Sequence, residues 1–365
     1  MEDLGIDTKN LNVTQQRSLR SVAGSYTYFA DGDVLLAKIT PCFENGKLGI
    51  ARDLKNGVGF GSSEFVVLRP GNDLIAEWLY YYLVRATFRG EGAKRMSGAV
   101  GHRRVAKEFV EEHPIPLPQV SEQQRIVAIL DEAFAGIATA KANAEKNLQN
   151  ARELFYGHLR ALFSESHDGW TGKTLREVAT DFGRGKSKHR PRNDPKLYGG
   201  PYPFIQTGDV RGADQLITEY TQTYNDAGLA QSKLWPNGTL CITIAANIAE
   251  TGILGFDACF PDSVIGVVVD QRQTSTKFLE YLLQTVKAAL KAKGKGSAQD
   301  NINLGTFENE RFPFPNLATQ AFIVEKLDAL SAAVREMESV CRRKLAALDE
   351  LKQSLLAKAF AGGLT

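Results

Sequence analysis

The residues that most often perform catalysis are present in this sequence, but none of them forms a catalytic arrangement. Gly185-Lys186-Ser187 looks like the end of a phosphate-binding loop, yet Thr180 stands where that motif requires a glycine. The sequence also lacks the GxSxG turn of serine hydrolases, the HExxH of zinc proteases and the Asn-Pro-Pro-Tyr or Asp-Pro-Pro-Tyr of amino-methyltransferases. Its five histidines are isolated from acid-base partners: His102, His113, His158, His167 and His189. We therefore predict no catalytic residue in this chain.

The cysteines and the hydropathy pattern argue against a metal site and a membrane span. Cys42, Cys241, Cys259 and Cys341 are scattered, with no histidine at ligand spacing, whereas a structural zinc needs clustered ligands. We expect them to be buried thiols in a reducing compartment. No stretch contains about eighteen uncharged apolar residues, and the N-terminus has neither the basic nor the apolar part of a signal peptide. The sequence therefore predicts a cytoplasmic protein with no metal and no membrane partner.

Positively charged residues, in contrast, gather in stretches that glycine, proline and polar residues mark as loops. The net charge is only +2, so the case for a nucleic-acid partner depends on where the charges lie. In the second half of the chain, the cations and accompanying polar residues are Arg184, Lys186, Lys188, Arg190, Arg192, Lys291, Lys293, Lys295, Ser297 and Asn301. In the first half, the cations are Arg89, Lys94, Arg95, Arg103 and Arg104.

Such residue types suit DNA. Lysine and arginine bind phosphates by charge, and serine, asparagine and arginine can hydrogen-bond to base edges, so we predict that these residues form DNA-binding surfaces. The alternative is an ordinary solvated surface. The recurrence of a basic stretch before a long helix in both halves of the chain favours DNA.

The two halves of the chain resemble each other. The correspondence begins with Pro116-Leu117-Pro118 and Pro313-Phe314-Pro315 and continues without a gap to Phe163 and Phe360. Further pairs at the same spacing are Gln123 and Gln320, Ile126 and Ile323, Leu130 and Leu327, and Asp131 and Asp328. A weaker correspondence upstream pairs Trp78 with Phe278 and Tyr81 with Tyr281. A long unit present only twice indicates a duplicated domain pair rather than a solenoid.

Each repeated segment predicts a long helix. Prolines precede it, no proline interrupts it, and Ser121 and Thr319 are candidate capping residues. Apolar residues then recur at alternating spacings of three and four, the pattern of a coiled-coil seam. The predicted seam residues are Ile126, Leu130, Ile137 and Leu154 in the first helix, and Ile323, Leu327, Leu330, Val334, Leu348 and Leu351 in the second. A lone amphipathic helix would pack on its own domain. Two equivalent helices in one chain favour an antiparallel coiled coil, each helix being about 60 Å long.

Together these features predict an α+β fold with a pseudo-twofold internal repeat. We expect a first α/β domain over 1–115, a first long helix over 116–165, a second α/β domain over 166–312 and a second long helix over 313–365. The stretch before Gly32 is less than half as long as the corresponding stretch from Trp170 to Gly238. We therefore expect the first domain to be shortened at its N-terminal side, with unpaired edge strands. The 365 residues are enough for two or three domains with real cores.

The duplicated motif resembles the specificity subunit of type I restriction-modification systems. The resemblance is carried by Pro116-Leu117-Pro118, followed by Glu122-Gln123 and Ile126, and by the equivalent residues of the second copy. Three further stretches are similar to the opening of a target-recognition domain of that family or to its usual C-terminal end: Trp170 to Val178, Tyr202 to Val210 and Leu355 to Leu364. The shortened first domain departs from the family pattern.

This resemblance implies a noncatalytic subunit whose two target-recognition domains read the two halves of a bipartite site in double-stranded DNA. It also implies that the helix pair spaces the domains and docks two methylation subunits, which bind S-adenosylmethionine and methylate adenine. Restriction subunits that use ATP would join the complex, and this chain itself would bind no cofactor. Two alternatives from other classes are a coiled-coil scaffold without a role on DNA and a fragment of a fused restriction or methylation enzyme. The missing catalytic motifs argue against the enzyme.

Overall fold

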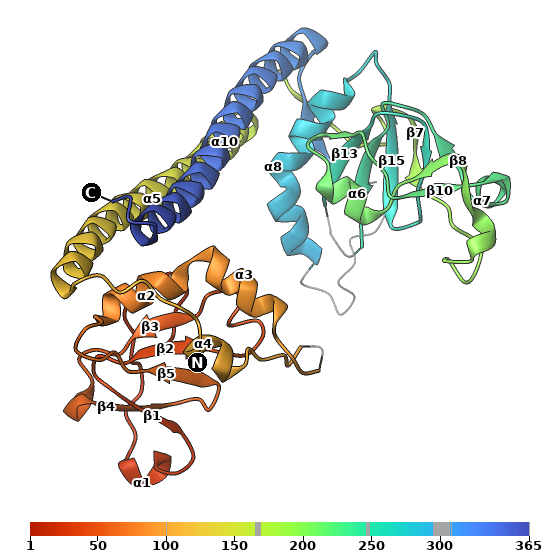
Figure 1. Ribbon diagram of the computed structural model, residues 1–365. Helices are drawn as coiled ribbons and strands as arrows, with labels where there is room; N and C mark the ends of the chain where they lie inside the picture. Colours follow the sequence, from red (N-terminus) through yellow and green to blue (C-terminus); the bar gives the residue numbers. More distant parts are fainter. Residues whose placement is uncertain (100, 165–168, 246–248, 295–306, 308, 365) are drawn as a thin grey trace. The chain divides into compact units, whose positions relative to one another are not determined.

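The computed structural model describes the chain except residues 100, 165–168, 246–248, 295–306, 308 and 365 (Figure 1). The chain folds into two compact units: unit 1 comprises Met1–Asn147 and Val340–Thr365, and unit 2 comprises Leu148–Ser339. The long helices α5 (Val120–Ser164) and α10 (Leu317–Phe360) each contribute one part to each unit. Each compact unit therefore combines one set of strands and short helices with parts of both long helices.

The elements of unit 1 that precede α5 are short. They are α1 (Leu19–Val22), β1 (Thr27–Ala30), β2 (Val34–Ala37), β3 (Leu48–Ile50), the 3-10 helix η1 (Lys55–Gly57), β4 (Val58–Gly61), β5 (Phe65–Leu68), α2 (Ala76–Val84), α3 (Ala86–Lys94) and α4 (Lys107–Glu111). The sheet β3–β2–β5 is antiparallel, and β1 and β4 form a separate two-stranded antiparallel ribbon. Helix α2 packs on β2 and β3 (Figure 1).

Strand β2 is buried on both faces, because its side chains point alternately to two different cores. Val34 and Leu36 belong to the core that contains Trp78 of α2. Leu35 and Ala37 belong to a second core on the opposite face. Full burial of such an apolar side chain contributes about 1.5–3 kcal/mol, so the short strand is held mainly by packing.

Unit 2 has a larger set of strands. Its elements between the long helices are β6 (Thr171–Lys173), β7 (Ala179–Arg184), the 3-10 helix η2 (Pro195–Leu197), β8 (Tyr198–Phe204), α6 (Thr207–Gly212), β9 (Leu216–Ile217), β10 (Gln222–Tyr224), α7 (Asp226–Ala230), β11 (Leu234–Trp235), β12 (Leu240–Thr243), β13 (Thr251–Leu254), β14 (Ala258–Cys259), β15 (Val264–Val269), α8 (Thr276–Gly294) and β16 (Phe312–Phe314). Three sheets result, in the orders β7–β15–β12–β13–β9, β10–β8–β14–β11 and β16–β6. Among its described residues, unit 1 forms no counterpart of the four-stranded sheet.

Strand β12 repeats the two-faced burial of β2. Leu240 and Ile242 face the core that contains Phe278 of α8, and Cys241 faces a second core that contains Trp235. Both strands are central in their sheets, and in both units a helix with buried aromatic side chains covers one face.

A buried glutamine ties α5 to the first domain. The Nε2 of Gln123 donates to the carbonyl oxygens of Asp73 (2.7 Å) and Pro118 (2.8 Å), and its Oε1 accepts from the backbone N–H of Ile75 (3.0 Å). The indole N–H of Trp78 donates to a further carbonyl in the same connection, that of Pro116 (2.8 Å). The proline-bounded segment before the helix is therefore fixed by side chains rather than by regular secondary structure.

Gln320 makes the same kind of contact in unit 2. Its Nε2 donates to the carbonyl oxygens of Gln273 and Pro315, both at 2.9 Å, and its Oε1 accepts from the hydroxyl of Thr274 (2.9 Å). Helix α10 begins beside this contact. The side chain of Asn316, the residue before the helix, accepts from the N–H of Thr319 in its first turn (2.9 Å). The helices thus begin at Val120 and Leu317, slightly before the capping residues expected from the sequence.

A tyrosine–aspartate pair recurs about two turns further along each helix. In unit 1, the Tyr81 hydroxyl donates to Asp131, which also pairs with Lys9 (2.6 Å). In unit 2, the Tyr281 hydroxyl donates to Asp328 (2.8 Å), which also pairs with Lys277 (2.6 Å). Burial and the neighbouring carboxylate raise the pKa of both tyrosines, so each hydroxyl keeps its proton and remains a donor.

The two long helices run in opposite directions within each unit. In unit 1, Leu130 shares a core with Leu356, and further along α5 Lys141 pairs with Asp349. Higher residue numbers on α5 therefore meet lower numbers on α10.

The same order holds in unit 2. Arg152 pairs with Glu338 at 2.6 Å, and Leu159 shares a core with Ile323 and Leu327. The direction of pairing is thus the same in both units, although each helix contributes a different part to each.

Only part of the predicted seam is buried. Ile126, Leu130, Ile137, Ile323 and Leu327 are buried, and Leu330, Val334 and Leu348 are half-buried. The prediction is wrong for Leu154 and Leu351, whose residues are 63% and 47% exposed. A strict heptad pattern drifts by about 20° per heptad around a straight α-helix, so positions late in the pattern turn away from the partner. Leu159 and Leu356 are buried in their place.

Candidate nucleic-acid interface

A cluster of exposed cations lies where β7 ends. We call residues 184–192 the basic loop. It continues from β7, which pairs with β15 at one edge of the five-stranded sheet, and the N–H of Gly185 donates to the carbonyl of Val264 (2.9 Å). Exposure alternates along its first half, with Gly185 and Ser187 buried and Lys186 and Lys188 exposed. Because alternate residues of an extended chain point to opposite sides, both lysines project from the same face of the loop.

Gly185 is required where the basic loop crosses the turn before β15. A Cβ at this position would lie 2.2 Å from the carbonyl oxygen of Phe260 and 2.5 Å from that of Pro261. Backbone atoms cannot move aside as a flexible side chain can, so any larger residue would displace the loop. The loop therefore begins in direct contact with the turn.

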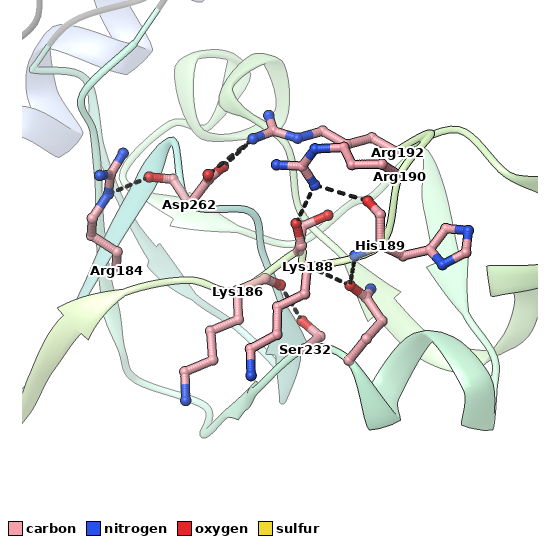
Figure 2. Close-up of polar contacts among 10 residues, drawn as sticks. Arg184, Lys186, Lys188, His189, Arg190, Arg192, Ser232 and Asp262 are labelled. Atoms are coloured by element: carbon pink, nitrogen blue, oxygen red, sulfur yellow. Dashed lines mark hydrogen bonds and ion pairs between the residues drawn. The ribbon is translucent and has the colours of Figure 1, made fainter.

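Asp262, a residue of this turn, holds both ends of the basic loop. The main-chain oxygen of Asp262 accepts from the Nε of Arg184 (2.6 Å), and its carboxylate accepts from one terminal nitrogen of Arg192 at 2.7 and 2.9 Å. Figure 2 shows Asp262 between the two arginines. The charge of Arg192 is thereby neutralised by a carboxylate of the same domain.

The middle of the basic loop is held by the two residues that follow α7 and by its own backbone. The Oε1 of Gln231 accepts from the N–H groups of Lys188 (2.6 Å) and His189 (3.0 Å), and the hydroxyl of Ser232 donates to the carbonyl of Lys186 (2.8 Å). Arg190 donates to carbonyl oxygens of the loop itself, those of Ser187 (2.6 Å) and His189 (2.8 Å). The backbone that carries the two lysines is therefore fixed at several points.

Two cations remain available on this surface. The side chains of Lys186 and Lys188 are exposed and have no partner among the described residues, and they point in the same direction, away from Asp262 (Figure 2). The five cations predicted here are thus brought together, but only these two ammonium groups are unengaged.

The cations of the first domain are more fully engaged. Arg104 binds Glu64 through two nitrogens at 2.7–3.2 Å, and these hydrogen bonds hold the pKa of Glu64 below its usual value. Arg103 donates to the carbonyl of Ala93 (3.0 Å). A salt bridge of this exposure is worth less than about 1 kcal/mol, but it cancels a charge that a phosphate would need.

The other three first-domain cations differ in environment. The guanidinium of Arg95 lies 5.2 Å from the ring centre of Phe109, and Arg89 is half-buried. Lys94, the last residue of α3, is exposed and has no partner among the described residues. Five predicted residues lie outside the described part of the structure, or have side chains that do: Lys291, Lys293, Lys295, Ser297 and Asn301.

Sequence reasoning missed the residues that position the basic loop. Gln231, Ser232 and Asp262 are neutral or acidic and lie far from residues 184–192 in the sequence, so no local pattern points to them. The paired glutamines Gln123 and Gln320 were visible as matching positions of the repeat, but their buried hydrogen bonds could not be inferred from it.

No catalytic arrangement is present in the part of the chain that the structure describes. A cavity of about 310 Å³ in unit 2 contains Glu280, whose pKa is raised by burial despite hydrogen bonds from Gln284, Gln215 and Thr251. The charged groups around it are paired with one another, as Arg152 is with Glu338. A carboxyl of raised pKa can serve as an acid, but the carboxylates that could act as a base beside it, such as Glu250 and Asp214, are held in ion pairs.

The described residues form neither a cluster of metal ligands nor a membrane-spanning helix. They contain no group of three or more metal-ligating side chains, and none of their helices is both long and apolar enough to span a bilayer. Cys241, Cys259 and Cys341 are buried free thiols as predicted, and burial raises the pKa of Cys241. Cys42 is only half-buried.

A family model described as "Type I restriction modification DNA specificity domain" matches residues 13–149 and 167–339. The chain belongs to this family. The two matched stretches include both basic surfaces, most of α5 and about half of α10. The resemblance drawn from the duplicated proline and glutamine motif is therefore confirmed.

Curated members of the family show similarity of two kinds. The EcoAI specificity subunit of Escherichia coli is 44% identical over 109 residues, which are 30% of this chain and 18% of that subunit. The StySPI specificity subunit of Salmonella potsdam is 23% identical over 318 residues, covering 82% of this chain and 67% of that subunit. The match to EcoAI thus spans less than a fifth of that relative's length, while the weaker similarity to StySPI covers most of both chains.

Solved structures share the fold. A chain from a structure described as "Structural basis underlying complex assembly and conformational transition of the type I R-M system" gives a TM-score of 0.84 at 22% identity, over 100% of this chain and 90% of that one. The HsdS subunit of Thermoanaerobacter tengcongensis gives 0.62 at 21% identity, over 100% and 89%. The predicted combination of α+β domains and long helices is thus confirmed at the level of fold.

Proposed function

We propose that this chain is the noncatalytic DNA-recognition subunit of a type I restriction-modification complex, and that its two α/β domains each read one half of a bipartite site in double-stranded DNA. The observation that carries the proposal is the pair of unengaged lysines, Lys186 and Lys188, on a braced loop of a DNA specificity family member. Ammonium groups bind backbone phosphates by charge, and a fixed loop limits which base edges its neighbours can reach.

The long helices would act as the spacer between the two reading domains. An antiparallel coiled coil with a pseudo-twofold repeat is supported by the opposite directions of α5 and α10 in each unit. It is also supported by equivalent contacts in the two units: Gln123 and Gln320 bind backbone groups in the same way, and Asp131 and Asp328 each accept from a tyrosine hydroxyl. A helix of 45 residues is about 68 Å long, and B-DNA repeats about every 34 Å. A helix of this length covers about two turns of B-DNA, which is enough to hold two readers on separate turns.

The same helices would dock two methylation subunits. Apolar side chains on them face solvent, including Leu154, Met337 and Leu351, and such exposure is typical of a surface that a partner covers. In this proposal S-adenosylmethionine is bound by the methylation subunits, ATP is used by restriction subunits, and this chain holds no cofactor. The complex would act in the cytoplasm, and this chain would select which adenines are methylated.

Methylome sequencing tests the proposal. Cells that carry this chain with its methylation subunit should methylate adenines in a two-part motif with a fixed gap. Replacing residues 170–310 with the corresponding segment of another family member should change one half of the motif and leave the other half and the partner binding intact. An unchanged motif would show that unit 2 does not read DNA, as expected for a scaffold.

A second measurement addresses the enzymatic alternative. The isolated chain should show no binding of S-adenosylmethionine by calorimetry, whereas the complex with the methylation subunit should bind it. Binding by the isolated chain would favour a fragment of a fused methylation enzyme.

A further inference from the structure

We infer that Asp262 is a positioning residue that withholds Arg192 from DNA and so sets which cations of the basic loop contact phosphates. The inference rests on the proposed function, because it concerns how this surface meets DNA. It assigns a role in DNA selectivity to an acidic residue, a type that DNA phosphates repel.

The position of Asp262 is fixed by the core on both sides of it. Phe260 is fully buried and stacks on Trp235 with ring centres 5.1 Å apart, and Val264, the first residue of β15, is also fully buried. The short turn between them can therefore move little, and its only long polar side chain is that of Asp262.

From this fixed turn Asp262 reaches both ends of the basic loop. Its main-chain oxygen accepts from Arg184, and its carboxylate accepts from Arg192 through both oxygens (Figure 2). A main-chain acceptor leaves the charge of Arg184 uncancelled, whereas the carboxylate cancels that of Arg192. The two arginines thus differ in what they can offer a phosphate, although the sequence places them in one basic stretch.

The pair of Arg192 and Asp262 is close enough to solvent to be opened. The side chains are 48% and 39% exposed, and an ion pair of such exposure contributes little to stability. Removing the carboxylate charge would therefore free Arg192 at little cost in stability. A freed guanidinium on the loop that carries Lys186 and Lys188 would bind one more phosphate without reading a base, which raises affinity for every DNA sequence.

The test is Asp262→Asn in the full chain bound to its methylation subunit, with a duplex that lacks the cognate site. One added phosphate contact should steepen the dependence of log K on log salt concentration by about 0.9, and should raise affinity for this duplex by about five- to tenfold at 0.1 M salt. The ratio of cognate to noncognate affinity should fall. An unchanged slope and an unchanged ratio would overturn the inference.

Two matched variants separate this effect from a simple loss of negative charge. Asp226→Asn removes the same charge from the same unit, where the carboxylate accepts from the hydroxyl of Tyr202 (3.1 Å) instead of holding an arginine. It should leave the slope unchanged. Asp262→Asn in an Arg192→Gln background should also leave the slope at the value of Arg192→Gln alone. A steeper slope in either variant would show that charge alone is responsible and would overturn the inference.

Failure of the proposed function would give a different result. If the unaltered complex binds no DNA, the basic loop does not contact DNA. The same conclusion follows if Lys186→Ala and Lys188→Ala leave the salt dependence of DNA binding unchanged. If the unaltered complex binds as proposed and Asp262→Asn behaves like it, only the role of Asp262 is wrong.

Discussion

The two units hold their long helices by the same contacts but differ in how they hold their cations. Gln123 and Gln320 are both buried and both accept and donate hydrogen bonds at the proline-bounded start of a helix. In the basic surfaces, by contrast, Arg104 of unit 1 is paired with Glu64, while unit 2 leaves Lys186 and Lys188 without partners among the described residues.

This difference separates two kinds of constraint. A helix start needs every buried carbonyl and N–H to be paired, and few side chains satisfy the same geometry, so both units use a glutamine. A DNA-reading surface faces solvent, where many arrangements of charge are equally stable. Two domains that read different half-sites would therefore keep the same glutamine at the helix start and differ in the positions of their cations.

The largest effect is expected from removing the buried glutamine that both units use at the start of a long helix. Gln320→Leu leaves the buried carbonyls of Gln273 and Pro315 without donors, which should lower the free energy of unfolding by about 3 kcal/mol. Gln123→Leu should have a comparable effect. Urea unfolding measures both, with the exposed neighbour Gln124→Leu as control. A strong effect in only one unit would show that the two glutamines are not equivalent.

The next effect contrasts the cations of the two units. Replacing Lys186 and Lys188 together by alanine should reduce the salt slope of DNA binding by about 1.8 and the affinity by about 60-fold at 0.1 M salt, because two phosphate contacts are lost. Lys94→Ala in unit 1 should reduce the slope by about 0.9. Titrations over a range of salt concentrations measure both values. Equal slopes for the double variant and the unaltered complex would contradict the assignment of these lysines.

A buried acid makes the stability of unit 2 depend on pH. The pKa of Glu280 is raised by burial, so unfolding releases its proton above the ordinary glutamate pKa of about 4.3. Its stabilising contribution is therefore present at low pH and lost as pH rises through the raised pKa. Glu280→Gln should raise the free energy of unfolding by on the order of 1 kcal/mol at pH 8 and leave it unchanged at pH 4. Unit 1 has Tyr80 at the corresponding position, so Tyr80→Phe should show no such difference between the two pH values.

The smallest effect has the opposite sign and belongs to unit 1. Burial acts to raise the pKa of Asp33, but hydrogen bonds from Arg69 and the N–H of Ala30 outweigh it and hold the pKa below its usual value. The stabilisation from Asp33 is therefore present above about pH 4 and lost as pH falls through the lowered pKa. Asp33→Asn should cost about 1 kcal/mol at pH 7 and less at pH 3. Thr239 occupies the corresponding position in unit 2, and Thr239→Val should give a loss that does not vary with pH.

Much of the fold could be predicted from the sequence, because its signals are local and repeated. The prolines, the absence of helix breakers and the apolar spacing indicated two long helices, and the structure has them at Val120–Ser164 and Leu317–Phe360. The seam was predicted less well. Leu154 and Leu351 fit the spacing but are exposed, because spacing along one helix does not determine where its partner helix lies.

By itself, the sequence determined the duplicated plan, the family and the stretches where positive charge gathers. Each of these depends on residues that are neighbours along the chain or that recur at one spacing. Only the tertiary structure decided which cations are available. Arg192 and Arg104 are neutralised by Asp262 and Glu64, residues distant in sequence that folding brings within 3 Å. A side chain's charge can be read from its type, but whether that charge is available depends on its neighbours in space.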